Sequence, residues 1–306
     1  MLFCLGSAVA FGAMGIFGRL AYDQGVSVGT LLAIRFVLAA VLFWAIVIAT
    51  GRLRRMQRRD VLMALALGGV GYSAQAGAYF AALQRIDPGL LSILLYTFPT
   101  MVTVAAIALG RERFSRRRAL ALVLASAGLV LVLAGAGAGA IEPVGAALGL
   151  SAAAIYTTYI LSSQGIAARL DPFLLSALVC TGAALTLTAV GAADGDLHAV
   201  SARGMLWLGA IAVVCTVAAV TLFFAGLRRV GPTRASIIST AEPLTAVLLA
   251  FAIFGETMTL LQLTGAALVI AGVVRVATAG RRDAQALRPH VPEDHGALPA
   301  LGPRAG

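Results

Sequence analysis

Charge is scarce in this 306-residue chain, because only 12% of its residues are Asp, Glu, Lys or Arg, and lysine is absent. A soluble domain of this size carries about a quarter charged residues, so an ordinary soluble fold is excluded. Hydrophobic residues make up 60% of the chain, and its mean hydropathy is +0.95. Continuous apolar runs recur along it, typical of helices that cross a ~30 Å hydrocarbon layer. They lack the alternation of barrel strands, so the sequence predicts an all-α integral membrane protein.

Several kinds of chemistry lack the residues they need. There is no glycine-rich phosphate-binding motif, which argues against an ATP-driven pump. The three histidines, His198, His290 and His295, fall in a loop or in the tail, which argues against an enzyme embedded in the membrane. The three cysteines lie inside apolar runs without metal-ligand spacing. We therefore expect a non-enzyme with no catalytic residues, no metal site and no cofactor.

The net charge of +10 does not point to a nucleic-acid partner, because the arginines gather in short loops where positive charge sets membrane orientation. Loops 51–59 and 111–118 each carry five arginines, and others follow residues 227 and 280. The intervening loops hold mostly Asp and Glu. The positive-inside rule then predicts a multi-pass protein of the cytoplasmic (inner) membrane with both termini in the cytoplasm.

The chain also repeats itself. Residues 229–256 match residues 85–112 at an offset of 144 (229 − 85 = 144), which takes Pro99 to Pro243. A fixed offset held over most of the chain indicates an internal duplication. Because each copy holds an odd number of spans, the second must lie inverted relative to the first, a recurring plan of secondary transporters.

We predict ten transmembrane helices as two inverted five-helix repeats. The first repeat covers 1–140, with the glycine-alanine stretch Gly135–Ala140 as the joint, the second covers 141–279, and 280–306 form a disordered cytoplasmic tail. The first apolar run is expected to be a retained helix, because residues 145–164 echo it. The predicted spans are about 2–20, 28–50, 60–84, 88–110, 117–136, 146–168, 172–192, 204–227, 233–254 and 260–278.

Paired proline helices that end in GRE (Gly110–Glu112) and GET (Gly255–Thr257), the segment Leu263–Val274, and the dipeptide Arg35-Phe36 resemble EamA-type members of the drug/metabolite transporter (DMT) superfamily. The resemblance covers about residues 2–278, and the first copy departs from it by having Phe98 where the second has Glu242. It implies two five-helix repeats and the export or exchange of small metabolites, with no substrate common to the family.

Two charged residues lie inside predicted spans, where charge is costly and usually faces a cavity or a partner. Arg35 lies roughly 10 Å from the outer side and Glu242 roughly 13 Å from the inner side, so they nearly meet in depth. We predict that Arg35 binds an anionic group of the substrate, or that Glu242 takes up a proton during transport. The alternatives are a structural ion pair and an arginine that extends to the outer interface.

Polar residues at helical spacing predict further substrate contacts on the third, fourth, sixth and ninth spans. For Tyr79, a place in the aromatic belt at the interface is an equally good interpretation. Pro99 and Pro243 are predicted hinges, because each would kink its span and leave a carbonyl unpartnered. The predicted contacts are Gln75, Tyr79, Tyr96, Tyr156, Tyr159 and Ser239.

The sequence thus favours a secondary active transporter that exports or exchanges small metabolites, amino acids or related amphipathic compounds among them, by alternating access. A membrane-embedded enzyme and a channel are the alternatives. The expected partners are a small-molecule substrate, the lipid bilayer and, as coupling ion, protons. The oligomeric state stays open.

Overall fold

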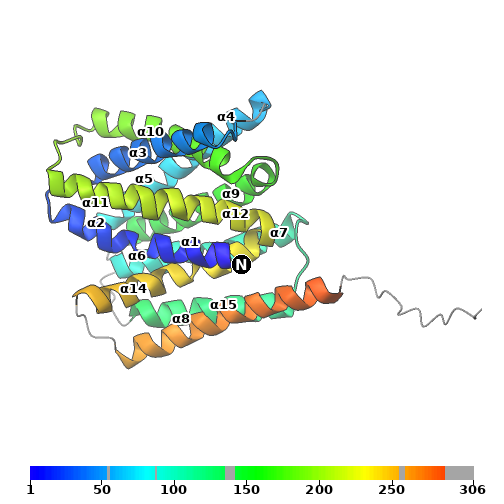
Figure 1. The fold of residues 1–306 in the computed structure, drawn as a ribbon. Coiled ribbons are helices and arrows are strands. Elements are labelled where there is room, and N and C mark those ends of the chain that lie inside the picture. The colour runs from blue at the N-terminus through cyan, green and yellow to red at the C-terminus, as the bar shows by residue number, and fades with distance from the viewer. Residues whose placement is uncertain (54–55, 87, 135–141, 255–258, 287–306) are drawn as a thin grey trace, which may run out of the picture.

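The computed structural model describes residues 1–53, 56–86, 88–134, 142–254 and 259–286. Every regular element in these ranges is a helix, which confirms the predicted all-helical class (Figure 1). Eight helical stretches are long and apolar enough to cross a membrane, and Leu260–Val276 is a shorter apolar one. The eight are Leu2–Tyr22, Val28–Ala49, Arg58–Leu83, Leu90–Ala108, Pro143–Arg169, Pro172–Ala193, Ala202–Val230 and Pro232–Ile253.

The helix boundaries repeat at the offset seen in the sequence. The starts of α6 and α13 differ by 144 (232 − 88 = 144), and so do those of α3 and α10 and of α8 and α15. The first-half elements are α1 (Leu2–Gly12), α2 (Met14–Tyr22), α3 (Val28–Ala49), α4 (Arg58–Ala66), η1 (Leu67–Tyr72), α5 (Ser73–Leu83), α6 (Pro88–Leu95), α7 (Phe98–Ala108) and α8 (Arg116–Ala134). The second-half elements are α9 (Pro143–Arg169), α10 (Pro172–Ala193), α11 (Ala202–Ala212), η2 (Val213–Ala218), α12 (Ala219–Val230), α13 (Pro232–Ser239), α14 (Ala241–Phe254) and α15 (Leu260–Ala286).

Equivalent helices of the two halves pack against each other in two places, α3 with α10 and α8 with α15, at opposite edges of the bundle (Figure 1). In the second pair, Gly128 lies against the backbone of Gly265, and Gly272 lies against Ala121. The contact order reverses along the two helices, so they run antiparallel. Glycine permits this close backbone approach, which supplies the packing that holds helices together in lipid.

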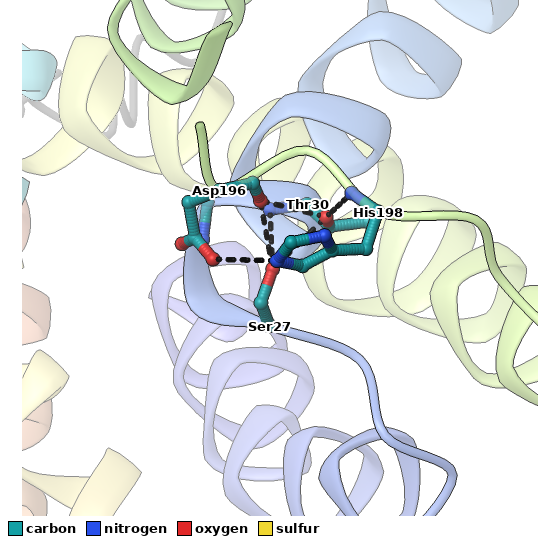
Figure 2. Close-up of polar contacts among 5 residues, drawn as sticks. Ser27, Thr30, Asp196 and His198 are labelled. Carbon is teal, nitrogen blue, oxygen red and sulfur yellow. Dashed lines mark hydrogen bonds and ion pairs between the residues drawn. The ribbon is translucent and has the colours of Figure 1, made fainter. Parts of the chain in front are cut away.

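The α3–α10 pair is tied at both ends and in the middle. At one end, the Asp196 carboxylate accepts a hydrogen bond from the Gly29 amide (2.6 Å), and the Ser27 hydroxyl donates to the Asp196 carbonyl (2.8 Å) (Figure 2). A carboxylate at the start of α3 also favours the positive end of the helix dipole. Three further contacts complete the ties: His198 N–H to Thr30 Oγ1 (2.8 Å), Trp44 Nε1 to Thr181 Oγ1 (3.0 Å), and the ion pair of Arg52 with Asp171 (3.1 Å).

Five of the membrane-spanning stretches are interrupted near their middles. The first breaks at Ala13, between α1 and α2, whereas its second-half equivalent α9 is continuous. Arg58–Leu83 and Ala202–Val230 widen into the π-helices η1 and η2, a rare distortion that often occurs at functional sites. Leu90–Ala108 breaks before Phe98, and Pro232–Ile253 breaks before Ala241. Interrupted helices at membrane depth free backbone groups where they line a site or pack within protein.

Three segments singled out in the sequence fall wholly or mostly outside the described residues. They are the joint Gly135–Ala140, the GET sequence Gly255–Thr257 and most of the predicted tail. Helix α15 extends to Ala286, beyond the predicted start of the tail at 280. Figure 1 shows the start of α1 and the end of α15 at the same end of the bundle.

Candidate functional site

Glu242 is the acidic residue that the fold brings to the middle of the bundle. It lies in the first turn of α14, where the helix dipole favours a negative charge, and it is half-buried. A side-chain hydrogen bond joins it to Tyr96, whose hydroxyl is the donor to the carboxylate. Tyr96 directly follows α6, so the pair connects the breaks of the two proline-containing spans. The backbone of α1 closes the other side, because Gly12 packs on the Glu242 carbonyl.

Arg35 lies inside the bundle with only 2% of its surface exposed. Its Nε donates to Thr216 Oγ1 (2.7 Å) and its Nη2 to the Cys215 carbonyl (3.4 Å), and both acceptors belong to the π-helix η2. Its Nη1 contacts Met14 Sδ at 2.9 Å, and its guanidinium lies over the Phe36 ring, 4.9 Å from the centroid. The widened turn of η2 therefore supplies polar groups to a charge that lipid would not solvate.

Arg35 and Glu242 are close enough to interact electrostatically. They form no direct ion pair among the contacts of the described residues, because the guanidinium is turned onto η2. The predicted nearness in depth therefore agrees with this arrangement, while the alternative of a direct structural pair does not describe it. Arg35 does not extend to the outer interface either, since it is fully enclosed.

Three tyrosines lie near Glu242: Tyr79, Tyr96 and Tyr156 are close enough to its carboxylate to interact electrostatically. Tyr72 packs edge-on against Phe36, and Tyr22, at the end of α2, is exposed.

Ring contacts continue the group. Phe98 lies between Tyr96 (centroids 5.6 Å apart) and Tyr156 (4.7 Å), and Tyr156 stacks on Tyr159 at 6.1 Å. Such pairs contribute beyond their buried area and hold the rings in fixed relative positions. Tyr96 lies in the break before α7, Phe98 is the first residue of α7, and the other two rings lie on α9, so the four rings belong to both halves of the chain.

The other two predicted substrate contacts, Gln75 and Ser239, lie on α5 and α13. Gln75 is half-buried on α5, one turn before Tyr79. Ser239 is buried at the end of α13, and its hydroxyl donates to the Ala235 carbonyl of its own helix (3.0 Å). Its role as a substrate contact stays a prediction, as do the roles of the other site residues.

The two prolines follow the interruptions of their spans. A kink is predicted at each of them, and each span is indeed interrupted there: Pro99 falls in the first turn of α7 and Pro243 in the first turn of α14. Their role as hinges stays a prediction. Proline is well accommodated there, because the first-turn N–H groups have no partner within the helix. The chain therefore ends one helix and begins another, with Tyr96 and Glu242 at the two breaks.

Sequence reasoning missed several contributors. Thr216 and Met14, which contact Arg35, carried no signal, because each is an ordinary residue in an apolar run.

Glu112 and Glu256 belong to the GRE and GET sequences. Glu112 is paired with Arg118, and its other oxygen accepts from the Thr233 amide at the start of α13 (3.4 Å). This carboxylate therefore connects α8 with α13. Glu256 lies outside the described residues.

A cavity of about 480 Å³ lies away from this group, where α3, α9 and α12 end. Two of its arginines, Arg52 and Arg169, are already paired with Asp171 and Asp60. They also complement the negative ends of α3 and α9, which accounts for their position. Among the described residues, no group of three or more His, Cys, Asp or Glu gathers to hold a metal ion.

An all-helical membrane protein built from two related halves, with interrupted helices around a carboxylate and an aromatic group, belongs to the class of membrane transporters with internal repeats. The model of the EamA-like transporter family matches residues 1–134 and 143–278. The chain belongs to this family.

Curated relatives of this chain are also named as transporters. An uncharacterized transporter of Archaeoglobus fulgidus is 30% identical over 88% of this chain and 92% of its own length. The uncharacterized transporter YcbK of Bacillus subtilis is 27% identical over 86% of this chain and 88% of its own. The uncharacterized inner membrane transporter YicL of Salmonella typhimurium is 26% identical over 75% and 77%.

A solved crystal structure shares the fold. It superposes with a TM-score of 0.81 over 91% of this chain and 98% of its own, at 18% sequence identity. At this identity the likeness concerns the fold alone. The chain is thus a multi-pass membrane protein of a transporter family.

Proposed function

We propose that this protein is a secondary active carrier that exports or exchanges small metabolites across the cytoplasmic membrane by alternating access. Amino acids and related amphipathic compounds are the substrates to test first. The observation that carries the proposal is the Tyr96–Glu242 hydrogen bond, which joins the breaks of two equivalent helices at a carboxylate inside the bundle. Broken helices around a mid-membrane site are the arrangement that secondary transporters use.

In this proposal the chain has ten membrane helices in two inverted repeats, 1–140 and 141–279, followed by a cytoplasmic tail, 280–306. The antiparallel packing of the equivalent helices α3 with α10 and α8 with α15 supports the inversion. Both termini lie in the cytoplasm of the inner membrane, as the arginine-rich loops and the shared end of α1 and α15 favour.

Each site residue takes a role that its position supports. Glu242 carries the coupling proton or contacts the substrate directly, and Tyr96 holds its carboxylate in place. Arg35 does not contact the substrate, because it is enclosed and two of its nitrogens are hydrogen bonded to η2, and its positive charge balances the negative charge of Glu242. The further contacts are Gln75, Tyr79, Tyr156, Tyr159 and Ser239.

Alternating access needs the two halves to move relative to each other. We assign the hinge to the breaks preceding Pro99 and Pro243, where the helix is already interrupted. The α3–α10 pair, tied at three levels, is the fixed part about which these broken spans move.

The test is counterflow in proteoliposomes with a panel of amino acids and related metabolites. A carrier accumulates labelled substrate against unlabelled internal substrate, which neither a channel nor an enzyme does. Repeating the assay with an imposed pH gradient tests protons as coupling ion. Failure of every panel member to show counterflow would contradict the proposal.

A further inference from the structure

Arg35 and Glu242, the two charged residues of the site, differ in how accessible they are to a ligand. Each of the three guanidinium nitrogens of Arg35 has a partner, in Thr216, Cys215 or Met14, and the side chain is almost fully enclosed. Glu242 keeps partly accessible surface and has the Tyr96 hydroxyl as its hydrogen-bond partner. A ligand that enters this region therefore meets a carboxylate and does not meet the guanidinium.

Aromatic rings lie close to this carboxylate. The Tyr96 hydroxyl is hydrogen bonded to Glu242, and Phe98 lies between the rings of Tyr96 and Tyr156. Tyr156 in turn stacks on Tyr159, so four adjacent rings extend from the carboxylate.

Aromatic faces beside a carboxylate favour a ligand with a positive charge. The ring quadrupole attracts ammonium groups, and the attraction grows when the cation is desolvated. A carboxylate on the ligand meets Glu242 as a like charge, which disfavours it.

We infer that this site selects amphipathic organic amines, with the ammonium group beside Glu242 and the apolar body among the tyrosine rings. The inference rests on the proposed function and narrows its substrate class from metabolites in general to cations. The ammonium N–H groups donate to the carboxylate oxygens of Glu242, to which the Tyr96 hydroxyl also donates. The Tyr156–Tyr159 pair then contacts the positive charge or the adjacent carbon atoms.

The experiment compares three probes that share a phenyl body and differ in charge: phenethylamine, L-phenylalanine and 3-phenylpropionate. Binding to the full-length protein in detergent is measured by calorimetry, and counterflow is measured in proteoliposomes. We expect phenethylamine to bind on the order of tenfold more tightly than the other two probes, or more. Replacing Glu242 with Gln should remove this preference.

A matched pair of variants at Tyr156 tests the aromatic ring separately from its hydroxyl group. Tyr156→Phe keeps the ring and should keep amine binding, whereas Tyr156→Leu removes it and should weaken binding on the order of tenfold. Asp171→Asn, in the surface pair with Arg52, is the control and should bind phenethylamine like the wild type.

Preference for the zwitterion or the anion, equal binding of the amine by wild type and Glu242→Gln, or no amine binding at all would overturn the inference. The two proposals fail separately. If phenethylamine binds as expected but no probe shows counterflow, the carrier proposal fails and the amine site stands. If L-phenylalanine or 3-phenylpropionate is the preferred counterflow substrate, the carrier stands and the amine site fails.

Discussion

Tyr96 and Glu242 are hydrogen bonded to each other across the two halves of the chain, at equivalent helix breaks. They are not equivalent residues: the offset of 144 pairs Tyr96 with Thr240 and Glu242 with Phe98. The duplication therefore supplies the two broken helices, and the divergence of the copies supplies the hydrogen bond between them. This pair of equivalent positions therefore holds one carboxylate, whereas two identical copies would hold two or none.

The first prediction concerns this bond. Tyr96→Phe keeps the ring against Phe98 and removes the hydroxyl that serves Glu242. Loss of a hydrogen bond to a charged group costs about 1.5–3 kcal/mol. We expect substrate affinity or exchange rate to change on the order of tenfold or more, measured by counterflow, while the protein still folds. Unchanged transport would mean that the hydroxyl does not hold the carboxylate in its working position.

The second prediction concerns Arg35. Arg35→Lys keeps the charge but cannot reach Thr216 and the Cys215 carbonyl at once, because an ammonium lacks the guanidinium fork. We expect a loss of stability of about 1–3 kcal/mol, seen as a lower melting temperature in detergent. Thr216→Val removes one acceptor and should give a smaller loss. A Lys variant as stable as the wild type would contradict this account of the buried charge.

The third prediction concerns helix packing. A Cβ at Gly68 would collide with the carbonyl of Val179 on α10, whereas nothing lies within 4 Å of a Cβ at Gly77 on the same span. Gly68→Ala should therefore destabilise the protein by about 1–3 kcal/mol through overpacking. The matched control Gly77→Ala should be neutral or slightly stabilising, because alanine favours helix by about 0.5–1 kcal/mol. Thermal unfolding of both variants checks the contrast, and equal behaviour would refute it.

The fourth prediction concerns the ends of α3. Asp196→Ala removes the acceptor of the Gly29 amide and should cost about 1–2 kcal/mol, the usual cost of losing a helix cap. Asp171→Ala breaks an exposed pair with Arg52 and should cost at most about 1 kcal/mol on that account, plus its own cap to Phe173. The hydrogen exchange of the first turn of α3 should rise in the Asp196 variant alone. Exchange that does not change would show that the cap is unimportant.

The fifth prediction concerns orientation. Cysteines placed at exposed Phe114 and exposed Leu197 should be labelled from opposite sides of the membrane, Phe114 from the cytoplasm. The native cysteines are buried and should give little background. Labelling of both positions from one side would contradict the proposed topology.

The sequence predicted the helical class and the register of the repeat, because apolar run length and a fixed offset are properties of the chain itself. The α3 and α10 boundaries follow that register residue by residue. The sequence also singled out Arg35 and Glu242, because a charged residue inside an apolar run is conspicuous.

What could not be predicted depends on local backbone geometry and on contacts between distant segments. Nothing in the residues 213–218 announces a π-helix, so the partners of Arg35 on η2 were missed. A proline in an apolar run indicates an interruption but does not say whether the helix kinks or restarts. That difference put Pro99 and Pro243 in the first turns of new helices.

The central claim is that Glu242 is the working group of a carrier, and counterflow of wild type beside Glu242→Gln in proteoliposomes tests it most directly. The account predicts that the wild type exchanges a panel substrate and that the variant, folded and reconstituted to the same level, loses that exchange or its response to a pH gradient. Exchange by the variant equal to the wild type at every pH would contradict the claim and leave Glu242 with a structural role.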